Sequence, residues 1–535
     1  MWSVTLVISI CGLAHGLSRI DPLVSTKAGL IRGLTTENGY STFLGVPYAL
    51  VNKNNPFGPS IPHPGFDNIY EAYETRECPQ VSNRADIIGS LDCLNMNIYV
   101  PNAADSQNPL PVMVWIHGGA FVRGSAHQEG SNPHSLLKND VIVVAINYRL
   151  GAYGFMCLDH PEISGNQGLK DQVLALRWIN KNIESFGGNA RQITVFGESA
   201  GGMSINLHLL SSYERLFQRA IIQSGPGFGP LLPMTLDNTY PIRLASLLNF
   251  NTTDVNEALV YLSSIDALEL VQAANNLQMS SLSITPLTLP CVEIQIEGVE
   301  HFLTEHPKNV ISSKARTTPV IIGHNNEEAS YIYVNAEYFD SYNFEDSLNI
   351  AFEFGDDFNA AADAVRHFYI GDEKITESVK WKISDFATDF EFGHPTQRSA
   401  EQLLSGGANT VYRYVFTYTG GRNLMSVMMN LNLTGAAHAD DLGYLFDLDA
   451  LFTGEMTPED QLVFDRMTTL WTNFAKHGDP TAVTSDLLPV KWEPITTTAQ
   501  PYLEIGSDLS LRSRPDHERM AFWDLFYKLY GNYQI

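Results

Sequence analysis

The chain has 535 residues, of which 44 % are hydrophobic and 17 % are charged, a globular composition with ample apolar material for a large core. Its formal net charge is -26 at pH 7. Nucleic-acid binding requires a positively charged surface, so this charge disfavours it, and it also disfavours binding to anionic membrane surfaces. We therefore expect a soluble protein that binds no nucleic acid. Length alone suggests about three domains.

The first 16 residues, MWSVTLVISICGLAHG, form an apolar run that ends in small residues around His15. This pattern predicts a signal peptide over residues 1–16, cleaved after Gly16, with residues 17–535 as the mature chain. An uncleaved anchor is the alternative, which the shortness of the run disfavours. No later stretch reaches the roughly 18 apolar residues that span a bilayer, and the C-terminus carries no retention or lipid-anchor signal. We expect secretion and no stable membrane insertion.

The cysteines of the mature chain fit an extracellular protein. Four remain after cleavage, and four cysteines allow three pairings. Cys78 and Cys93 are expected to close a loop of about 15 residues, worth roughly 3 kcal/mol in the chain-entropy account. Cys157 and Cys291 are expected to be free core residues, since unpaired cysteine is commonly buried.

Two sequons become candidate glycosylation sites once secretion is expected. They begin at Asn251 and Asn432, and each has the Asn-x-Thr pattern of an acceptor site. Chance occurrence is the alternative for both.

Apolar runs that end in glycine-rich turns recur along the first half of the chain. Buried strands are predicted within residues 111–121, 141–151, 193–196 and 219–225, and helices within residues 172–183 and 203–210. Strands that alternate with helices and are apolar on both faces predict an α/β protein with a mostly parallel sheet. The second half is more acidic and more helical, with helices expected at 266–278, within 340–400 and at 516–530.

The sequence Gly197-Glu198-Ser199-Ala200-Gly201 follows the strand at 193–196 and precedes a helix-compatible segment. That context, rather than the five letters alone, is typical of a nucleophile elbow, in which a strained turn exposes the serine at the top of a sheet. We therefore expect Ser199 to be an acyl-transfer nucleophile at a helix N-terminus.

A tetrahedral oxyanion needs N–H donors beside such a serine. Gly118 and Gly119, in the double-glycine turn that ends the strand within 111–121, and Ala200, directly after the serine, are the candidates for this oxyanion hole. An ordinary strand-to-loop turn is the alternative for the two glycines.

At this point the chain resembles the type-B carboxylesterase/cholinesterase family of α/β-hydrolases, and within it the secreted insect esterases such as antennal esterases. The resemblance covers nearly the whole mature chain and is carried by FLGVPYA, DCLNMNIYVP, WIHGGAF, NYRLGAYGF, GNQGLKDQ, FGGNARQITVFGESAGG and GAAHADDLGYLF. It implies an α/β-hydrolase fold and a Ser–Glu–His triad. Because Gly118, Ser199 and His438 must then meet, one large catalytic domain over residues 17–535 replaces the three suggested by length.

The resemblance also assigns the other two members of the triad. His438 matches the family's histidine motif and follows the nucleophile and acid in the hydrolase order, whereas His117 and His324 are expected to be structural. Aligning the acid motif in VIIGHNNEEASY places Glu328 in the triad and leaves Glu327 as a solvated or loop-fixing neighbour.

One residue of the acid motif departs from the family. The family usually has glycine after the triad glutamate, where this chain has Ala329. An alanine does not freely adopt positive φ, so either the backbone there is ordinary or the acid loop is changed.

Other departures bear on the substrate. The segment between the first two cysteines of the mature chain has no aromatic residue, so the cation–π recognition of choline seen in cholinesterases is not expected. Juvenile hormone esterases usually have glutamine before the nucleophile, where this chain has Glu198.

The family's second disulfide is expected to be missing.

The sequence therefore predicts a secreted carboxylic ester hydrolase that acts on a small-molecule ester through an acyl-enzyme on Ser199 and needs no cofactor. No H-E-x-x-H or Cys/His spacing suggests a metal site. General carboxylesterase activity, including degradation of odorant, pheromone or xenobiotic esters, is the main hypothesis, and juvenile hormone esterase is an alternative within the class. The alternative from a different functional class is a cholinesterase-like adhesion protein without catalytic activity.

Overall fold

The computed structural model describes residues 22–127, 132–281, 285–330, 342–448, 451–452 and 454–531. The predicted signal peptide, residues 1–16, lies outside the described residues. In the part of the chain that is described, no helix is both long enough and apolar enough to cross a bilayer.

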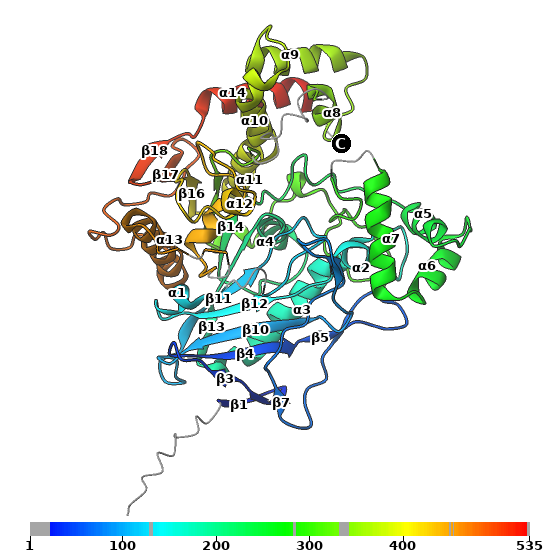
Figure 1. Ribbon diagram of the computed structural model, residues 1–535, viewed down its shortest axis with the longest axis vertical. Helices are drawn as coiled ribbons and strands as arrows, with labels where there is room; N and C mark the ends of the chain where they lie inside the picture. Colours follow the sequence, from blue (N-terminus) through cyan, green and yellow to red (C-terminus); the bar gives the residue numbers. More distant parts are fainter. Residues whose placement is uncertain are drawn as a thin grey trace, which may run out of the picture.

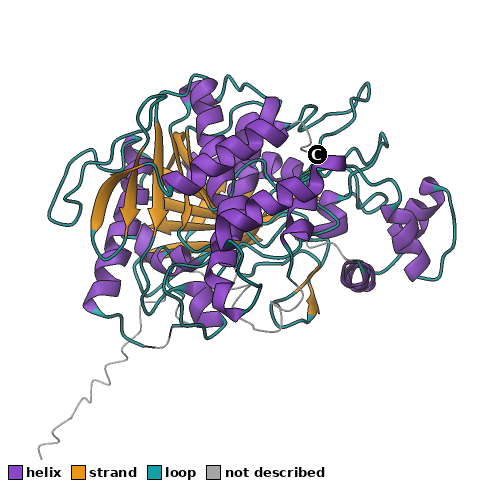
Figure 2. Cartoon of the chain, turned by 90° about the horizontal axis from the view of Figure 1, so that it is seen from above, coloured by secondary structure: helices purple, strands orange, loops and turns teal. Residues whose placement is uncertain are grey.

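An 11-stranded sheet runs through the molecule (Figures 1 and 2). Its strands, in spatial order, are β18 (Leu509–Ser513), β17 (Pro501–Ile505), β16 (Val411–Phe416), β15 (Val320–Asn325), β14 (Arg219–Gln223), β13 (Gly188–Glu198), β11 (Leu110–Ile116), β12 (Ile142–Ile146), β10 (Asn95–Pro101), β4 (Tyr40–Pro47) and β3 (Leu34–Thr35). The strands from β17 to β12 are mutually parallel, and antiparallel strands complete both edges. The predicted mostly parallel sheet is therefore confirmed.

Short strands form three small sheets outside the central one. These strands are β1 (Leu23–Thr26), β2 (Gly29–Arg32), β7 (Tyr70–Glu71), β5 (Ala49–Leu50), β6 (Ile61–Pro62), β8 (Gln80–Val81) and β9 (Ile87–Ile88).

Helices cover both faces of the central sheet (Figure 2). The helices are α1 (His134–Leu137), α2 (Gly151–Phe155), α3 (Gln167–Asn182), α4 (Ala200–Leu210), α5 (Tyr240–Leu247), α6 (Val255–Ser263), α7 (Ala267–Ser280), α8 (Phe344–Asn349), α9 (Phe358–Ile370), α10 (Lys380–Thr388), α11 (His394–Ser405), α12 (Leu424–Met428), α13 (Pro458–His477) and α14 (His517–Tyr530). The helices α5, α6 and α7 lie at one side of the molecule, and α8, α9, α10 and α14 gather at its top in Figure 1.

The core has two main layers because neighbouring residues of a strand point to opposite faces. Val112 and Val114 of β11 pack in the layer with α3, α4 and part of α11. Met113 and Trp115 pack in the layer with α13 on the other face. This double-sided burial explains why the central strands are almost wholly apolar in sequence.

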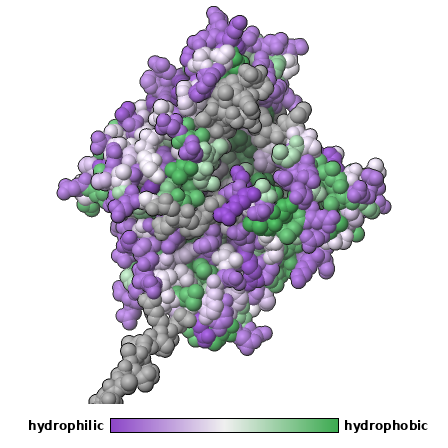
Figure 3. Space-filling view, in the orientation of Figure 1, coloured by the Kyte–Doolittle hydropathy of each residue, from purple (hydrophilic) through white to green (hydrophobic). Residues whose placement is uncertain are grey.

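The surface differs from this apolar interior. In the view of Figure 3, hydrophilic side chains cover most of the periphery, and hydrophobic ones gather around a hollow near the centre of this face. A mainly hydrophilic surface agrees with the formal net charge of -26, which keeps protein molecules apart in solution.

Two disulfides are present, one as predicted and one against prediction. Cys78 and Cys93 are bonded across a separation of 15 residues. Cys157 and Cys291, which we expected to be free, are bonded across 134 residues, with their Cα atoms 6.4 Å apart. The expectation of a single disulfide is therefore wrong. Burial does not distinguish a free cysteine from a disulfide-bonded one, because both are commonly buried in a core. The bond forms because the loop after α2 lies against residue 291, with both sulfur atoms beside Gly165.

Candidate active site

Ser199 lies in the turn that joins β13 to α4, with φ 55° and ψ -126°. An L-residue rarely adopts this conformation. The turn is tightly enclosed, since a Cβ atom at Gly201 would lie 2.0 Å from the carbonyl oxygen of Ile116. Ser199 stays partly exposed at the N-terminus of α4, where the helix dipole favours negative charge. The local structure is therefore the expected elbow.

The double-glycine loop after β11 lies against this elbow. A Cβ atom at Gly118 would lie 3.1 Å from the Cβ of Ser199 and 2.8 Å from the carbonyl oxygen of Glu198. The backbone then takes positive φ at Gly119, Ala120 and Phe121, with values of 104°, 54° and 63°. A side chain at Gly118 would collide with the elbow, and the unusual backbone that follows is of the kind that clusters at functional sites.

His117 supports this loop. Its Nδ1 lies 2.9 Å from the carbonyl oxygen of Gly118, and its own carbonyl accepts a hydrogen bond of 2.9 Å from the hydroxyl of Tyr148. The two rings are stacked. Burial lowers the pKa of His117 to about 4, so the ring is neutral at pH 7 and acts as a fixed part of the loop's frame.

Glu328 is fully buried in the loop after β15. One oxygen, Oε2, lies 2.6 Å from Nδ1 of His438. The other, Oε1, accepts hydrogen bonds from the Ser224 hydroxyl at 2.5 Å and from the Asn325 backbone N–H at 2.7 Å. The backbone N–H of His438 also donates to the Glu328 carbonyl at 3.0 Å. The carboxylate is thus held in one orientation, and it faces the imidazole.

The second nitrogen of His438 meets another carboxyl group. Its Nε2 lies 3.1 Å from Oε1 of Glu198, the residue directly before Ser199. Burial opposes a charge on His438, but Glu198 and Glu328 outweigh burial and raise its pKa to about 9. Burial raises the pKa of Glu198 to about 8. Because the charge of each group shifts the pKa of the other, His438 and Glu198 titrate as a pair.

Further residues that we did not predict from the sequence surround His438. The ring of Phe392 packs on the imidazole with centroids 4.9 Å apart. Burial raises the pKa of its neighbour Glu391 to about 7 and that of Asp441 to about 6. Asp441 accepts a hydrogen bond of 2.7 Å from the amide of Gln223. The motif around His438 contains Asp441, but nothing in the sequence near Phe392 distinguishes it from an ordinary helical residue.

The backbone answers the question raised by Ala329. Ala329 is not among the residues with positive φ, so no glycine is needed there. Its side chain is fully buried, and its N–H donates to the Thr388 hydroxyl at 3.2 Å. Glu327 is half-buried and accepts a hydrogen bond of 3.1 Å from the Thr434 hydroxyl. It therefore fastens the acid loop to the segment that leads to His438.

These residues converge because parallel strands end at the same edge of a sheet. Gly118 follows β11, Ser199 follows β13 and Glu328 follows β15. The strands lie in the order β15-β14-β13-β11 across the sheet. The carboxyl edge of an open α/β sheet is the usual place for a ligand site. The order of these strands along the chain does not by itself show that they are neighbours in the sheet.

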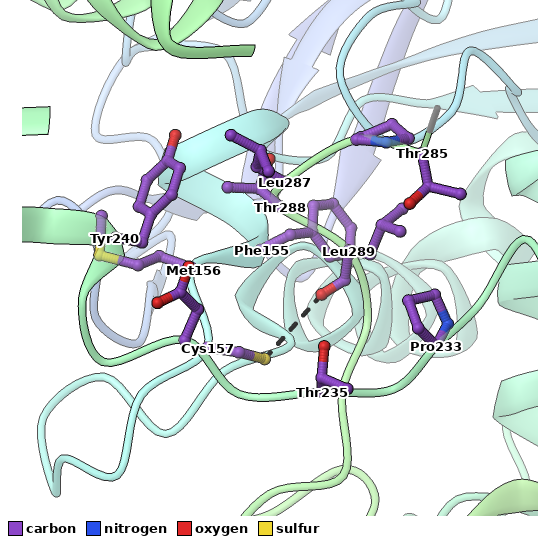
Figure 4. Close-up of a pocket in the computed structure, with 12 residues that line it drawn as sticks. Phe155, Met156, Cys157, Pro233, Thr235, Tyr240, Thr285, Leu287, Thr288 and Leu289 are labelled. Carbon is purple, nitrogen blue, oxygen red and sulfur yellow. Dashed lines mark hydrogen bonds between the residues drawn. The ribbon is translucent and has the colours of Figure 1, made fainter. Parts of the chain in front are cut away.

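A cavity of about 190 Å³ lies apart from these residues, beside the Cys157–Cys291 disulfide (Figure 4). It is lined by the end of α2 and by segments 233–240 and 285–289, including Met156, Tyr240 and Leu289. Neither Ser199 nor His438 lines it. Its volume is below the roughly 300–1,000 Å³ of typical ligand sites, and we assign it no role in ester binding.

Comparison with known proteins gives one family. The family model described as "Carboxylesterase family" matches residues 20–523. Juvenile hormone esterase of Tribolium castaneum is 32% identical over 496 residues, which cover 86% of this chain and 84% of that protein. Esterase FE4 of Myzus persicae is 31% identical, over 88% of this chain and 87% of its own length.

A solved structure is also similar over nearly the whole chain. It is juvenile hormone esterase from Manduca sexta, with OTFP covalently attached, at a TM-score of 0.81 and 27% identity. The match covers 95% of this chain and 100% of that one.

Proposed function

We propose that this chain, which belongs to the carboxylesterase family, hydrolyses esters outside the cell through Ser199, His438 and Glu328. The protein is a carboxylic ester hydrolase with the α/β-hydrolase fold, as its relatives and the similar solved structures show. The assignment of residues, the site of action and the substrate are our proposal.

In the proposed reaction, Ser199 Oγ attacks the ester carbonyl carbon while Nε2 of neutral His438 takes the hydroxyl proton. The new oxyanion is stabilised by the N–H groups of Gly118, Gly119 and Ala200. Collapse breaks the bond to the alcohol oxygen, which receives the proton from His438. Water then attacks the acyl-enzyme with His438 again as base, and the acid leaves as Ser199 recovers its proton. Glu328 would keep the imidazole in one tautomer and stabilise its charge.

One observation carries this assignment. The fully buried Glu328 meets Nδ1 of His438 at 2.6 Å, while the opposite nitrogen of the same ring reaches the residue that precedes Ser199. The ring therefore bridges the acid and the elbow. An imidazole oriented by a buried carboxylate on one side, with its other nitrogen at a strained serine turn, is the arrangement that acyl transfer needs.

For the substrate, we propose small apolar esters, such as short-chain odorant or xenobiotic esters. The segment between Cys78 and Cys93 lacks the aromatic residue that would favour a cationic alcohol. Juvenile hormone esterase is the second candidate, because relatives with that name match most of the chain, although Glu198 stands where those enzymes are expected to have glutamine. Comparing kcat/KM for acetate, long-chain, juvenoid and xenobiotic esters distinguishes the candidates.

Secretion and glycosylation are also part of the proposal. Asn251 and Asn432 are both exposed, as an acceptor asparagine must be, and two disulfides favour an oxidising compartment. Mass spectrometry of the protein from the culture medium of expressing insect cells tests both points. An N-terminus other than residue 17 or unmodified sequons contradicts them.

Hydrolysis of p-nitrophenyl acetate tests the enzymatic proposal against the inactive adhesion alternative. We expect steady-state turnover, and covalent inactivation by an organophosphate with the adduct on Ser199. Folded protein without turnover would favour the adhesion alternative, and an adduct on another residue would refute the assigned nucleophile.

A further inference from the structure

Arg413 of β16 is an unusual buried arginine. It is fully buried, and its Nε, Nη1 and Nη2 atoms have no hydrogen-bond partner among the described residues. Arg149 is equally buried but binds Asp171 through two nitrogens at 2.7 and 2.8 Å and donates to the carbonyls of Pro56 and Gly58. Burial of a guanidinium without an anionic partner is costly. Arg413 therefore needs a partner that the described side chains do not supply.

The face on which Arg413 lies follows from strand alternation. Val411 of β16 and Ile322 of β15 pack in the layer that contains Ala400 and Leu403 of α11. Arg413 lies two residues from Val411 on the same strand and therefore points to the same face, toward α11, which packs on both β15 and β16.

His324 of β15 points to the same face. His324 and Ile322 are two residues apart on β15, so their side chains point to the same face. Ile322 pairs with Arg413 of β16, and His324 pairs with Val415 of the same strand. The ring is buried, and its Nδ1 atom has no hydrogen-bond partner among the described residues. Two nitrogen-bearing side chains on adjacent strands thus face α11 from the sheet.

The facing helix contributes two hydroxyl groups. Thr396 and Ser399 of α11 are fully buried, and neither hydroxyl has a hydrogen-bond partner among the described residues. Buried hydroxyls in helices often donate to the carbonyl four residues earlier, as Ser204, Thr468 and Thr472 do here. Thr396 and Ser399 do not, so both can donate to a group between the helix and the sheet.

The acidic groups near Arg413 favour its positive charge, but no carboxylate of the described part of the chain accepts a hydrogen bond from its guanidinium. Burial lowers its pKa to about 10, and the charges of Glu401 and Asp516 act in the opposite direction, so it is charged at pH 7. The carboxylate of Glu401 instead accepts from the Gln500 amide at 3.4 Å, and that of Asp516 lies 3.1 Å from the Arg519 guanidinium. Long-range attraction therefore favours the charge but does not satisfy the donors.

We propose that Arg413, His324, Thr396 and Ser399 form a binding site for one small monovalent inorganic anion, such as chloride. The group contains a guanidinium and two hydroxyl donors, and among the described residues no carboxylate accepts a hydrogen bond from them. A water molecule would accept from these donors but would leave the charge of Arg413 unbalanced, whereas an anion satisfies both. His324 lies on the strand that leads to the loop of Glu328, so the anion holds β15 and α11 together behind the candidate active site.

Thermal unfolding of the full-length protein tests the site. At constant ionic strength, replacing gluconate by chloride is expected to raise Tm with saturation, by roughly 2–3 °C when chloride reaches about 100 times its Kd. R413M is expected to lose this chloride dependence, and T396V/S399A to shift the half-saturation point to higher chloride. R219M is the control, because Arg219 donates to the Ala475 carbonyl from another strand, and it should keep the wild-type response.

Crystals of the unmodified protein soaked in bromide give a test that does not depend on a variant folding. An anomalous peak within hydrogen-bond distance of the Arg413 guanidinium is the expected result. The absence of that peak refutes the proposal, as does a wild-type Tm that responds equally to chloride and gluconate or a chloride response that persists in R413M.

Discussion

His438 has two carboxylate neighbours with different tasks. Glu328 meets Nδ1, is fully buried and accepts two further hydrogen bonds, so in the proposed reaction it orients the imidazole. Glu198 meets Nε2, the nitrogen that receives the proton of Ser199 in the proposed reaction. With its pKa raised to about 9, His438 holds a proton near neutral pH, and this proton has to be released before the ring can act as a base.

The two adjacent glutamates at 327 and 328 are expected to respond differently to the same substitution. E328Q removes the charge that orients and stabilises the imidazole, and kcat should fall by about 10⁴-fold, as for other triad carboxylates. E327Q keeps the hydrogen bond to Thr434 possible, and kcat should change little. Steady-state kinetics on p-nitrophenyl acetate measures both, and the reverse ranking would show that the acid is Glu327.

The contact between Glu198 and His438 predicts a pH effect. Burial lowers the pKa of His438, and the negative charge of Glu198 is the largest of the effects that raise it to about 9. E198Q should therefore lower this pKa, and the rising limb of kcat/KM against pH should move to lower pH, by about one unit or more for a strongly coupled pair. A pH profile from about pH 5 to pH 10 brackets both values. An unchanged limb, or one displaced to higher pH, contradicts the inferred coupling.

At the scale of elements, the π-helical segment η8 (Asp389–Gly393) between α10 and α11 departs from regular helix. Such segments are rare and often lie at functional sites. Here the segment turns Phe392 onto His438 while Phe390 stacks against Trp523 in the core. The irregular winding thus serves both the site and the core within one short segment.

F392A is expected to loosen the imidazole without removing any group that touches the reacting atoms. A small displacement of a catalytic group can cost up to about 100-fold, so kcat should fall roughly 10- to 100-fold and the pH profile should change. F390A is the matched control, because it removes core packing from the same segment. It should lower Tm while kcat per folded molecule stays near the wild-type value. A wild-type kcat in F392A would rule out a positioning role.

At the scale of the whole molecule, the two disulfides close loops of very different length, 15 and 134 residues. The longer one joins the segment after α2 to a segment that follows α5, α6 and α7 in the chain. It is therefore a tertiary restraint, whereas the shorter one is local.

The chain-entropy model predicts unequal stabilisation by the two bonds. Loss of the Cys157–Cys291 bond in C157A/C291A should cost about 5 kcal/mol, and loss of the shorter loop in C78A/C93A about 3 kcal/mol. Guanidinium unfolding without added oxidant or reductant measures both free energies. Equal costs, or a larger cost for the short loop, would mean that packing and strain outweigh loop entropy.

The elements around the site were largely predictable because their signals are local. The apolar runs predicted β11, β12, β13 and β14. Boundaries differed where the signal weakens: α3 begins at Gln167 rather than 172, and β13 begins at Gly188 rather than 193. The short strands near the N-terminus and the π-helical segment had no periodic pattern strong enough to predict them.

The sequence by itself indicated the nucleophile, the oxyanion glycines and the histidine of the proposed triad, because Ser199, its flanking glycines and His438 lie in motifs whose meaning depends on a few adjacent residues. Only the tertiary structure decided which groups touch. The Cys157–Cys291 bond, the contact of Glu198 with His438 and the isolation of Arg413 all involve side chains that are distant in sequence or lie on different elements. Periodicity and spacing report what one segment buries, whereas pairing depends on distances that exist only after the segments have packed.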